Sequence, residues 1–286
     1  MPTPKPPLLQ YERNIHSQYG EDGVLAYALG RLPARDKWCV EFGAWDGKYC
    51  SNTCALIESS DFSAVLIECD PKKIEVLRQT HLANKKVHIV CRLVGFDGPD
   101  ILDKILAETP IPKDFDVLSI DIDGNDYHVW DALKDHRPKL VVIEFNPTIP
   151  NEIEFVQPRE MRLAQGCSLR SLDALARSKG YSLIHATFGN AIFADRKYSE
   201  CFGAEPVEAS DYRADLSAVT YLFQTFEGKI LLSGNRDMCW HNVRMDEKSM
   251  QAIPGYLQKY PDRYNLIQKV CWKVFHLWSK LTGRSR

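Results

Sequence analysis

Short apolar runs alternate with helix-length segments from residue 37 to about residue 195, and this alternation constrains the fold more than any other feature. Runs rich in Val, Ile, Leu and Phe predict seven strands, at residues 38–42, 64–68, 87–91, 116–120, 140–145, 181–185 and 191–194. Helical segments are expected near residues 52–60, 71–82, 99–108, 127–135 and 168–179. Such alternation predicts βαβ units and a mostly parallel sheet covered by helices.

The two ends of this region have their own signatures. The last two predicted strands, 181–185 and 191–194, are joined by a short loop with a glycine and an asparagine, which predicts an antiparallel hairpin at the sheet edge. Upstream, residues 17–32 have the periodicity of an amphipathic helix, with Ser17 as the expected N-cap. We therefore expect an additional helix across the sheet.

Composition excludes several classes of protein. The 286 residues include 36 Lys and Arg against 38 Asp and Glu, and 44% are hydrophobic, which is typical of a globular chain rather than a disordered or collagen-like one. A net charge of −2 argues against nucleic-acid binding. The nine cysteines lie mostly in apolar runs and are expected to be reduced. The N-terminal residues do not read as a secretory signal, and no apolar run approaches the ~18 residues of a membrane span, so we expect a cytoplasmic protein.

A glycine-containing turn follows the first predicted strand, in the segment WCVEFGAWDGKYCSNT. Glu41 ends the strand, and Gly43 and Gly47 would allow a ligand to approach backbone amides. Trp45 stands where a dinucleotide-binding turn has its second glycine, so a pyrophosphate fits poorly. Glu68 ends the second strand, where an acidic residue binds the hydroxyls of an adenosine ribose. The pattern indicates an adenosine ligand without a pyrophosphate.

These segments resemble the class I S-adenosylmethionine-dependent methyltransferases, and the FkbM-type family in particular. EFGAWDG occupies the place of the family's DxGANxG turn, LSIDIDGND that of its fourth-strand motif, and SLRSLDALARSKGYSLIHATFGNAIFAD that of its closing helix, hairpin and asparagine. The resemblance covers roughly residues 15–196 and departs at Trp45 and Ser119. It implies a Rossmann-like α/β fold, with a seven-stranded, mostly parallel sheet whose last strand is antiparallel, followed by a C-terminal extension.

The same resemblance implies that S-adenosylmethionine is the cofactor. Its methionine part would face the turn after the first strand, its ribose the end of the second strand, and its adenine the loop after the third. The expected cofactor-binding residues are Glu41, Gly43, Gly47, Glu68, Asp97 and Asp121.

Acidic and amide side chains follow the fourth and fifth predicted strands. Carboxylates at neighbouring strand ends share one crevice and repel each other unless they are paired, protonated or neutralised by a cation. Oxygen ligands favour Mg²⁺ or another hard divalent cation. The pattern resembles the macrocin-type sugar O-methyltransferases, which implies Asp121, Glu144 and Asn146 as metal ligands and Asp123 or His128 as the base. A metal-free alternative, in which Asp121 contacts the methionine amine, stays open.

We therefore expect an enzyme that methylates a hydroxyl of a sugar, glycan or glycan-like natural product, with or without a metal. Trp240 and His241, in the C-terminal extension, are candidate contacts to this acceptor, because Trp stacks well on sugar rings. Two alternatives remain: a nicotinamide-dependent oxidoreductase on a similar sheet, and a catalytically inactive adaptor at a membrane. A homo-oligomer is also left open.

Residues 263–286 carry six Lys and Arg and no Asp or Glu, which leaves −8 on the other 262 residues. Apolar residues recur at spacings of three and four in residues 266–281, as in an amphipathic helix that lies in a membrane surface. A peripheral location on the inner face of the membrane, with a lipid-linked acceptor, is one interpretation; packing on the domain or on a second copy is the other. The expected parts are a flexible Pro-rich lead (1–14), the methyltransferase domain (15–198), a substrate-side extension (199–262) and this helix (263–286).

Overall fold

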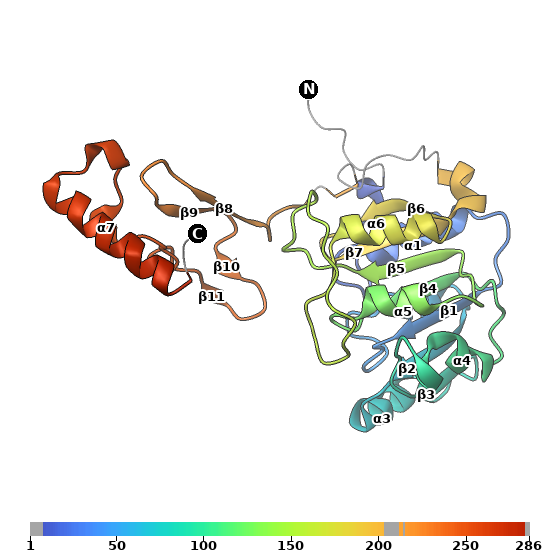
Figure 1. Ribbon diagram of the computed structural model, residues 1–286. Coiled ribbons are helices and arrows are strands. Elements are labelled where there is room, and N and C mark those ends of the chain that lie inside the picture. The colour runs from blue at the N-terminus through green and yellow to red at the C-terminus, as the bar shows by residue number, and fades with distance from the viewer. Residues whose placement is uncertain (1–7, 203–211, 214, 284–286) are drawn as a thin grey trace. The chain divides into compact units, whose positions relative to one another are not determined.

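The computed structural model describes residues 8–202, 212–213 and 215–283. The chain divides into two compact units, Met1–Leu216 and Ser217–Arg286. Figure 1 labels their elements. The described part of the expected Pro-rich lead is ordered by packing, since Leu8 is buried in a core and Leu9–Tyr11 forms a 3-10 helix. The basic C-terminal helix falls in the second unit together with residues from 217 onward.

A seven-stranded sheet forms the centre of the N-terminal unit. Its strands are β1 (Trp38–Phe42), β2 (Ser63–Glu68), β3 (Val87–Cys91), β4 (Val117–Ile120), β5 (Leu140–Glu144), β6 (Tyr181–Ala186) and β7 (Asn190–Asp195). They lie in the order β3-β2-β1-β4-β5-β7-β6. Only β7 runs antiparallel to its neighbours, β5 and β6. The predicted sheet, including its closing hairpin, is therefore confirmed.

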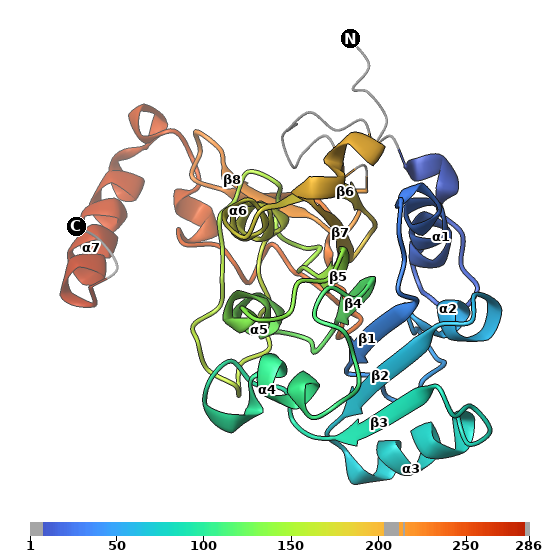
Figure 2. The ribbon, with the colours of Figure 1, turned by 90° about the vertical axis from the view of Figure 1, so that its right-hand side faces the viewer.

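Helices cover both faces of this sheet (Figure 2). One face packs against α1 (Glu21–Arg31), α2 (Cys54–Ser59) and α3 (Pro71–Thr80). The other packs against α4 (Leu102–Ala107), α5 (Asp126–Ala132) and α6 (Leu169–Ser178). Because both faces of the central strands are buried, those strands are continuous apolar runs rather than alternating ones.

The first helix begins later than its sequence pattern indicated. Gly20, with a φ of 100°, is the N-cap of α1, so the prediction of Ser17 as the cap is wrong. One carboxylate oxygen of Asp22 instead accepts the backbone N–H groups of Ile15, His16 and Ser17, at 2.7 to 2.8 Å, and the Ser17 hydroxyl. The segment before the helix is thereby folded back onto the helix start.

The strand order reverses between β1 and β4. The chain runs from β1 outward to β2 and β3, and then returns to β4 on the other side of β1. In open α/β sheets, ligands bind beyond the carboxyl ends of the strands at such a reversal. Here the backbones of the two strand ends touch, since a Cβ at Gly43 would lie 2.0 Å from the carbonyl oxygen of Asp121. The candidate site is therefore expected beside Gly43 and Asp121.

The C-terminal unit contains two small hairpins and a helix. The strands β8 (Thr220–Gln224) and β9 (Ile230–Gly234) pair antiparallel, and β10 (Asp237–Met238) pairs with β11 (Val243–Arg244). The helix α7 (Leu266–Leu281) starts with a capping box between Asn265 and Gln268. None of the described helices is long and apolar enough to span a bilayer.

Candidate active site

The turn between β1 and α2 is fixed by hydrogen bonds to the buried carboxylate of Glu41. Glu41 accepts hydrogen bonds from the Ser51 hydroxyl at 2.6 Å, the Thr53 hydroxyl at 2.7 Å and the Asn52 backbone N–H at 2.8 Å. Burial raises the pKa of Glu41, and these three donors oppose the shift. In the structure Glu41 therefore positions the turn; direct contact of this residue with the cofactor stays a prediction.

The same turn is also tied to β4. The Asn52 side chain donates a hydrogen bond to the Ser119 hydroxyl at 3.1 Å, and both side chains are buried. Ser119 is one of the two departures from the FkbM-type pattern. Its hydroxyl ties β4 to the turn that follows β1, across the strand-order reversal, which gives this departure a structural role.

A second carboxylate fixes the middle of the turn. Trp45 has a left-handed backbone, with a φ of 47°, and its N–H donates to Glu68 at 3.0 Å. The other oxygen of Glu68 accepts the N–H groups of Cys69 and Asp70, each at 2.8 Å. Two carboxylate oxygens offer about four acceptor positions, so Glu68 keeps capacity for a further donor such as a ribose hydroxyl.

Gly47 has a packing role in this turn. It has a φ of 74°, and a Cβ there would lie 2.5 Å from the Leu77 side chain and 2.7 Å from that of His81. The turn thus packs tightly against α3 and the residue that follows it. Gly43 and Gly47 are both required by close approach, and only Gly43 lies at the junction of β1 and β4.

Three acidic side chains converge at the ends of β4 and β5. Asp121, Asp123 and Glu144 each have a carboxylate oxygen within 4.8 Å of the others. Burial and the neighbouring acids raise the pKa of Asp121 to about 8 and that of Glu144 to about 10. Asp121 and Glu144 are half-buried, whereas Asp123 is exposed. The structure thus brings together three of the acidic residues that the sequence singled out.

The loop that carries two of these acids is shaped by a fourth. Asp126 is buried and accepts the backbone N–H groups of Ile122, at 2.9 Å, and Gly124, at 2.8 Å. Burial raises its pKa to about 6. This loop conformation leaves Asp123 with a φ of 56°. Asp126 therefore orients the acidic cluster through the backbone.

Two expected site residues, His128 and Asn146, form hydrogen bonds with residues outside the acidic cluster. His128 donates from Nε2 to the Gln157 carbonyl at 2.9 Å, and the edge of its ring contacts Phe96. The amide oxygen of Asn146 accepts from the N–H and hydroxyl of Thr148, and its nitrogen donates to the Gln165 carbonyl. The prediction of Asn146 as a ligand is therefore not supported by its orientation, and Asp123 is better placed than His128 to act as the base.

The remaining expected contacts are one residue of the N-terminal unit and two of the C-terminal unit. Asp97 is exposed in the loop after β3. Trp240 and His241 lie between β10 and β11 in the C-terminal unit, where Trp240 is 60% exposed. The roles of Asp97 toward adenine, and of Trp240 and His241 toward an acceptor, stay predictions.

A cavity of about 640 Å³ opens beside the β1–α2 turn. One wall is residues Ile15 to Tyr19, and the other is formed by the turn, including Asp46 and Tyr49. The Tyr19 ring packs on Phe188 at a centroid distance of 4.9 Å. Burial raises the pKa of the Tyr19 hydroxyl, and Glu21, Glu144 and Asp121 add to the shift, which places Tyr19 within electrostatic reach of the acidic cluster.

The sequence pattern gave this wall no site role, since residues 17–19 were expected to begin the helix and residues 15–16 to precede it. Its position depends on Glu21, which is fully buried and accepts from the Tyr19 backbone N–H at 2.8 Å. The other oxygen of Glu21 accepts from the Thr187 hydroxyl at 2.7 Å and the Asn190 amide at 3.0 Å. The acid at the start of α1 and the asparagine of the β6–β7 hairpin were visible in the sequence, but their pairing across the fold was not.

A second group of possible ligands does not favour a metal. His16, Cys54 and Glu58 have side-chain atoms within 4.8 Å of one another. However, His16 and Glu58 already pair at 2.9 Å, and burial raises the pKa of the Cys54 thiol to about 12. A protonated thiol is a poor ligand, so this group is better explained as a histidine hydrogen-bonded to a glutamate beside a buried cysteine.

Residues 100–183 match the model of the family described as Methyltransferase FkbM domain. The match spans less than a third of the chain, and the strand order with its antiparallel β7 is that of the predicted Rossmann-like fold. The predicted resemblance to the FkbM-type methyltransferases is thereby confirmed. A search of curated proteins found no match.

Solved structures with a similar arrangement include three methyltransferases. TrmK from M. capricolum, in complex with S-adenosyl-homocysteine, has a TM-score of 0.36 and 9% identity and covers 59% of this chain and 67% of its own. A SAM-dependent methyltransferase from Aquifex aeolicus has a TM-score of 0.37 and 9% identity, and the likeness covers 62% of this chain and 89% of that protein. The N-terminal domain of EvdMO1 with SAH bound has a TM-score of 0.39 and 14% identity, and the likeness covers 62% of this chain and 80% of that domain's chain. These likenesses add nothing about the substrate of this chain.

Proposed function

We propose that the N-terminal unit transfers a methyl group from S-adenosylmethionine to a hydroxyl of a sugar, glycan or glycan-like natural product. The observation that carries this proposal is the cluster of Asp121, Asp123 and Glu144. It lies at the strand-order reversal, where the ends of β1 and β4 touch at Gly43. A nucleotide-type site and the proposed base, Asp123, would thus share one crevice.

The cofactor is proposed to bind along the ends of β1 and β2. The left-handed turn at Gly43 and Trp45 brings backbone against this crevice, and Glu68 can accept from the ribose. The exposed Asp97 would lie toward the adenine. The methionine part would then extend toward Asp121, at the end of β4, and place the sulfonium methyl group beside the acidic cluster.

Methyl transfer from a sulfonium is an in-line displacement. The bond from carbon to sulfur breaks as the bond from carbon to the acceptor oxygen forms, and the hydroxyl proton leaves to a base. The protein must align the three atoms and receive the proton. The exposed Asp123 is the proposed base, and the cavity walled by Ile15 to Tyr19 is the proposed entrance for the acceptor.

The acidic cluster also fits a divalent cation. Its three carboxylates supply the hard oxygen donors that Mg²⁺ takes, and they lie close enough to share one ion. Asp121 and Glu144, from adjacent strand ends, would hold it. A bound cation would neutralise the repulsion within the cluster and lower the pKa of the acceptor hydroxyl. In the metal-free alternative, Asp121 contacts the methionine amine, and Asp121 and Glu144 share protons.

Transfer of labelled methyl groups to a panel of sugars and glycans tests this function. Asp123→Asn should reduce turnover at least about 100-fold without weakening cofactor binding, because it removes the base alone. Asp114→Asn, at an exposed position away from the cluster, is the matched control and should leave turnover unchanged. Turnover of Asp123→Asn equal to that of the wild type would remove Asp123 from its proposed role.

The metal is tested separately from the function. Protein treated with EDTA should lose activity and regain it on addition of Mg²⁺ or Mn²⁺, because the cation orients the acceptor. Full activity after EDTA treatment, with no gain on adding either ion, would favour the metal-free alternative and leave the methyltransferase proposal intact.

A further inference from the structure

The helix α7 presents three different faces. Successive residues of an α-helix are about 100° apart around its axis, so positions can be assigned to sectors. One sector, roughly 120° wide, is apolar and exposed, with side-chain exposures between 45% and 80%. This apolar stripe consists of Ile267, Val270, Val274, Leu277, Trp278 and Leu281.

A second sector attaches the helix to its own unit. The Gln268 side chain donates to the Tyr256 carbonyl at 2.8 Å, and the Trp272 ring lies 6.0 Å from that of Tyr264. Ser279, on the same side, is buried. Phe275 also belongs to this sector, where it is half-buried and lines a hollow together with Ile253 and Pro254. Packing against the unit therefore leaves most of the apolar stripe uncovered.

The third sector is basic and borders the apolar stripe. It contains Lys269, Lys273 and Lys280, with His276, and all four are exposed. No acidic residue occurs from residue 263 to the C-terminus, so the stripe has cations beside it and no anions within the helix. An exposed apolar face flanked by lysines is the arrangement with which helices bind anionic lipid surfaces.

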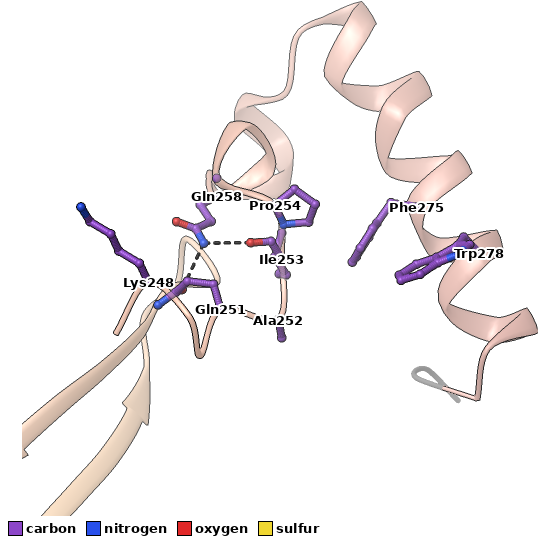
Figure 3. Close-up of a pocket in the computed structure, with 9 residues that line it drawn as sticks. Lys248, Gln251, Ala252, Ile253, Pro254, Gln258, Phe275 and Trp278 are labelled. Atoms are coloured by element: carbon purple, nitrogen blue, oxygen red, sulfur yellow. Dashed lines mark hydrogen bonds between the residues drawn. The ribbon is translucent and has the colours of Figure 1, made fainter. Parts of the chain in front are cut away.

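A hollow beside the helix does not offer a separate polar site. It has a volume of about 520 Å³, and in Figure 3 Phe275 and Trp278 face Ile253 and Pro254 across it. Its amide groups are used within the loop, since Gln258 donates to Gln251 and to the Ile253 carbonyl at 3.0 and 2.9 Å. The hollow therefore extends the apolar surface of Trp278 rather than adding a ligand-binding group.

From these faces we infer that α7 docks the protein on an anionic lipid bilayer, with the apolar stripe inserted among the lipids and the lysines at their headgroups. A second copy of the chain is a poorer occupant. Two stripes packed together would bring the lysines of both helices alongside the seam, and residues 263–286 have no acid with which to pair them. The inference does not depend on methyl transfer, and its test measures binding rather than activity.

The test is co-sedimentation of the full chain with two kinds of vesicle, phosphatidylcholine alone and phosphatidylcholine with one-third phosphatidylglycerol. We expect binding to the anionic vesicles, release by salt, and little binding to the neutral ones. The variant with Lys269, Lys273 and Lys280 changed to Gln should bind on the order of 100-fold more weakly. The control, with the exposed Lys72, Lys85 and Lys113 changed to Gln, has the same change in charge and should bind as the wild type does.

The apolar stripe has its own matched pair of variants. Val274→Gln with Leu277→Gln should weaken binding at least roughly 10-fold, because it removes apolar surface that would enter the bilayer. Val76→Gln with Leu82→Gln makes the same change at exposed positions in the N-terminal unit and should have no effect. All substituted side chains are exposed, and circular dichroism checks that each variant is folded.

Three results would overturn the inference. The first is a full chain that does not bind anionic vesicles, and the second is equal weakening by the α7 variants and their controls. The third is a stable dimer, seen by light scattering, that becomes a monomer when Val274 and Leu277 are substituted; this would show that a second copy covers the stripe.

Discussion

At Gly43, the residue after β1, a Cβ would collide with the backbone after β4, so the close approach of these two strand ends depends on this glycine. Gly43→Ala should destabilise the fold by at least about 2 kcal/mol, because the residue has a positive φ and its new Cβ would lie 2.0 Å from the Asp121 carbonyl. Gly98→Ala is the matched control: its φ is 64°, but a Cβ there meets nothing within 4 Å among the described residues. Thermal unfolding of the two variants measures the difference, and equal losses would show that strain alone matters at Gly43.

The acidic cluster predicts how stability depends on pH. The pKa values of Asp121 and Glu144 are raised to about 8 and about 10, so in the folded protein these groups keep protons that the unfolded chain has lost. Cation-free protein should therefore become less stable as the pH rises from about 5 to about 9. Asp121→Asn with Glu144→Gln should flatten this dependence in thermal melts. A wild-type protein that gains stability over that range would contradict the cluster as described.

At the scale of elements, the conformation of the β1–α2 turn depends on the side chain of Glu41, which accepts three hydrogen bonds from it. Glu41→Ala would leave two hydroxyls and one backbone N–H without their acceptor in a buried place, and should cost about 2–4 kcal/mol of stability. Glu41→Gln should cost less, because the amide oxygen can still accept the Asn52 N–H. Urea unfolding checks the order, with the exposed Glu152→Ala as the control. Equal stability of Glu41→Ala and wild type would show that the turn is held by other contacts.

The elements also show where sequence reasoning succeeds and where it stops. The seven strands could be predicted because the central ones are buried on both faces, which makes them apolar runs with glycine and proline between them. Periodicity indicated Ser17 as the helix cap. It could not show that the Asp22 side chain binds Ser17 and folds the segment before the helix back onto the helix start. The partners of Asn146 and His128 could not be predicted because they lie in irregular loops, and the site roles of these two residues stay predictions.

For the whole molecule, the net charge of −2 is the sum of an acidic part and a basic part of the chain. An acidic N-terminal unit gathers carboxylates at the ends of β4 and β5, and the last 24 residues carry six positive charges. If α7 docks on anionic lipid as we infer, the positive charges of residues 263–286 bind the protein to the lipid surface. The acidic cluster would then take part in the proposed methyl transfer. An acceptor displayed on a lipid carrier would connect the two and is the acceptor class to test first.

Calorimetric titration of the full chain with S-adenosylmethionine, and separately with NAD, tests the central claim most directly. We expect S-adenosylmethionine to bind with a dissociation constant in the micromolar range and NAD not to bind detectably, since Trp45 occupies the place of the glycine that a pyrophosphate needs. Binding of NAD in place of S-adenosylmethionine would point to an oxidoreductase. Binding of neither by folded protein would point to an inactive adaptor, and either result would contradict the proposed function.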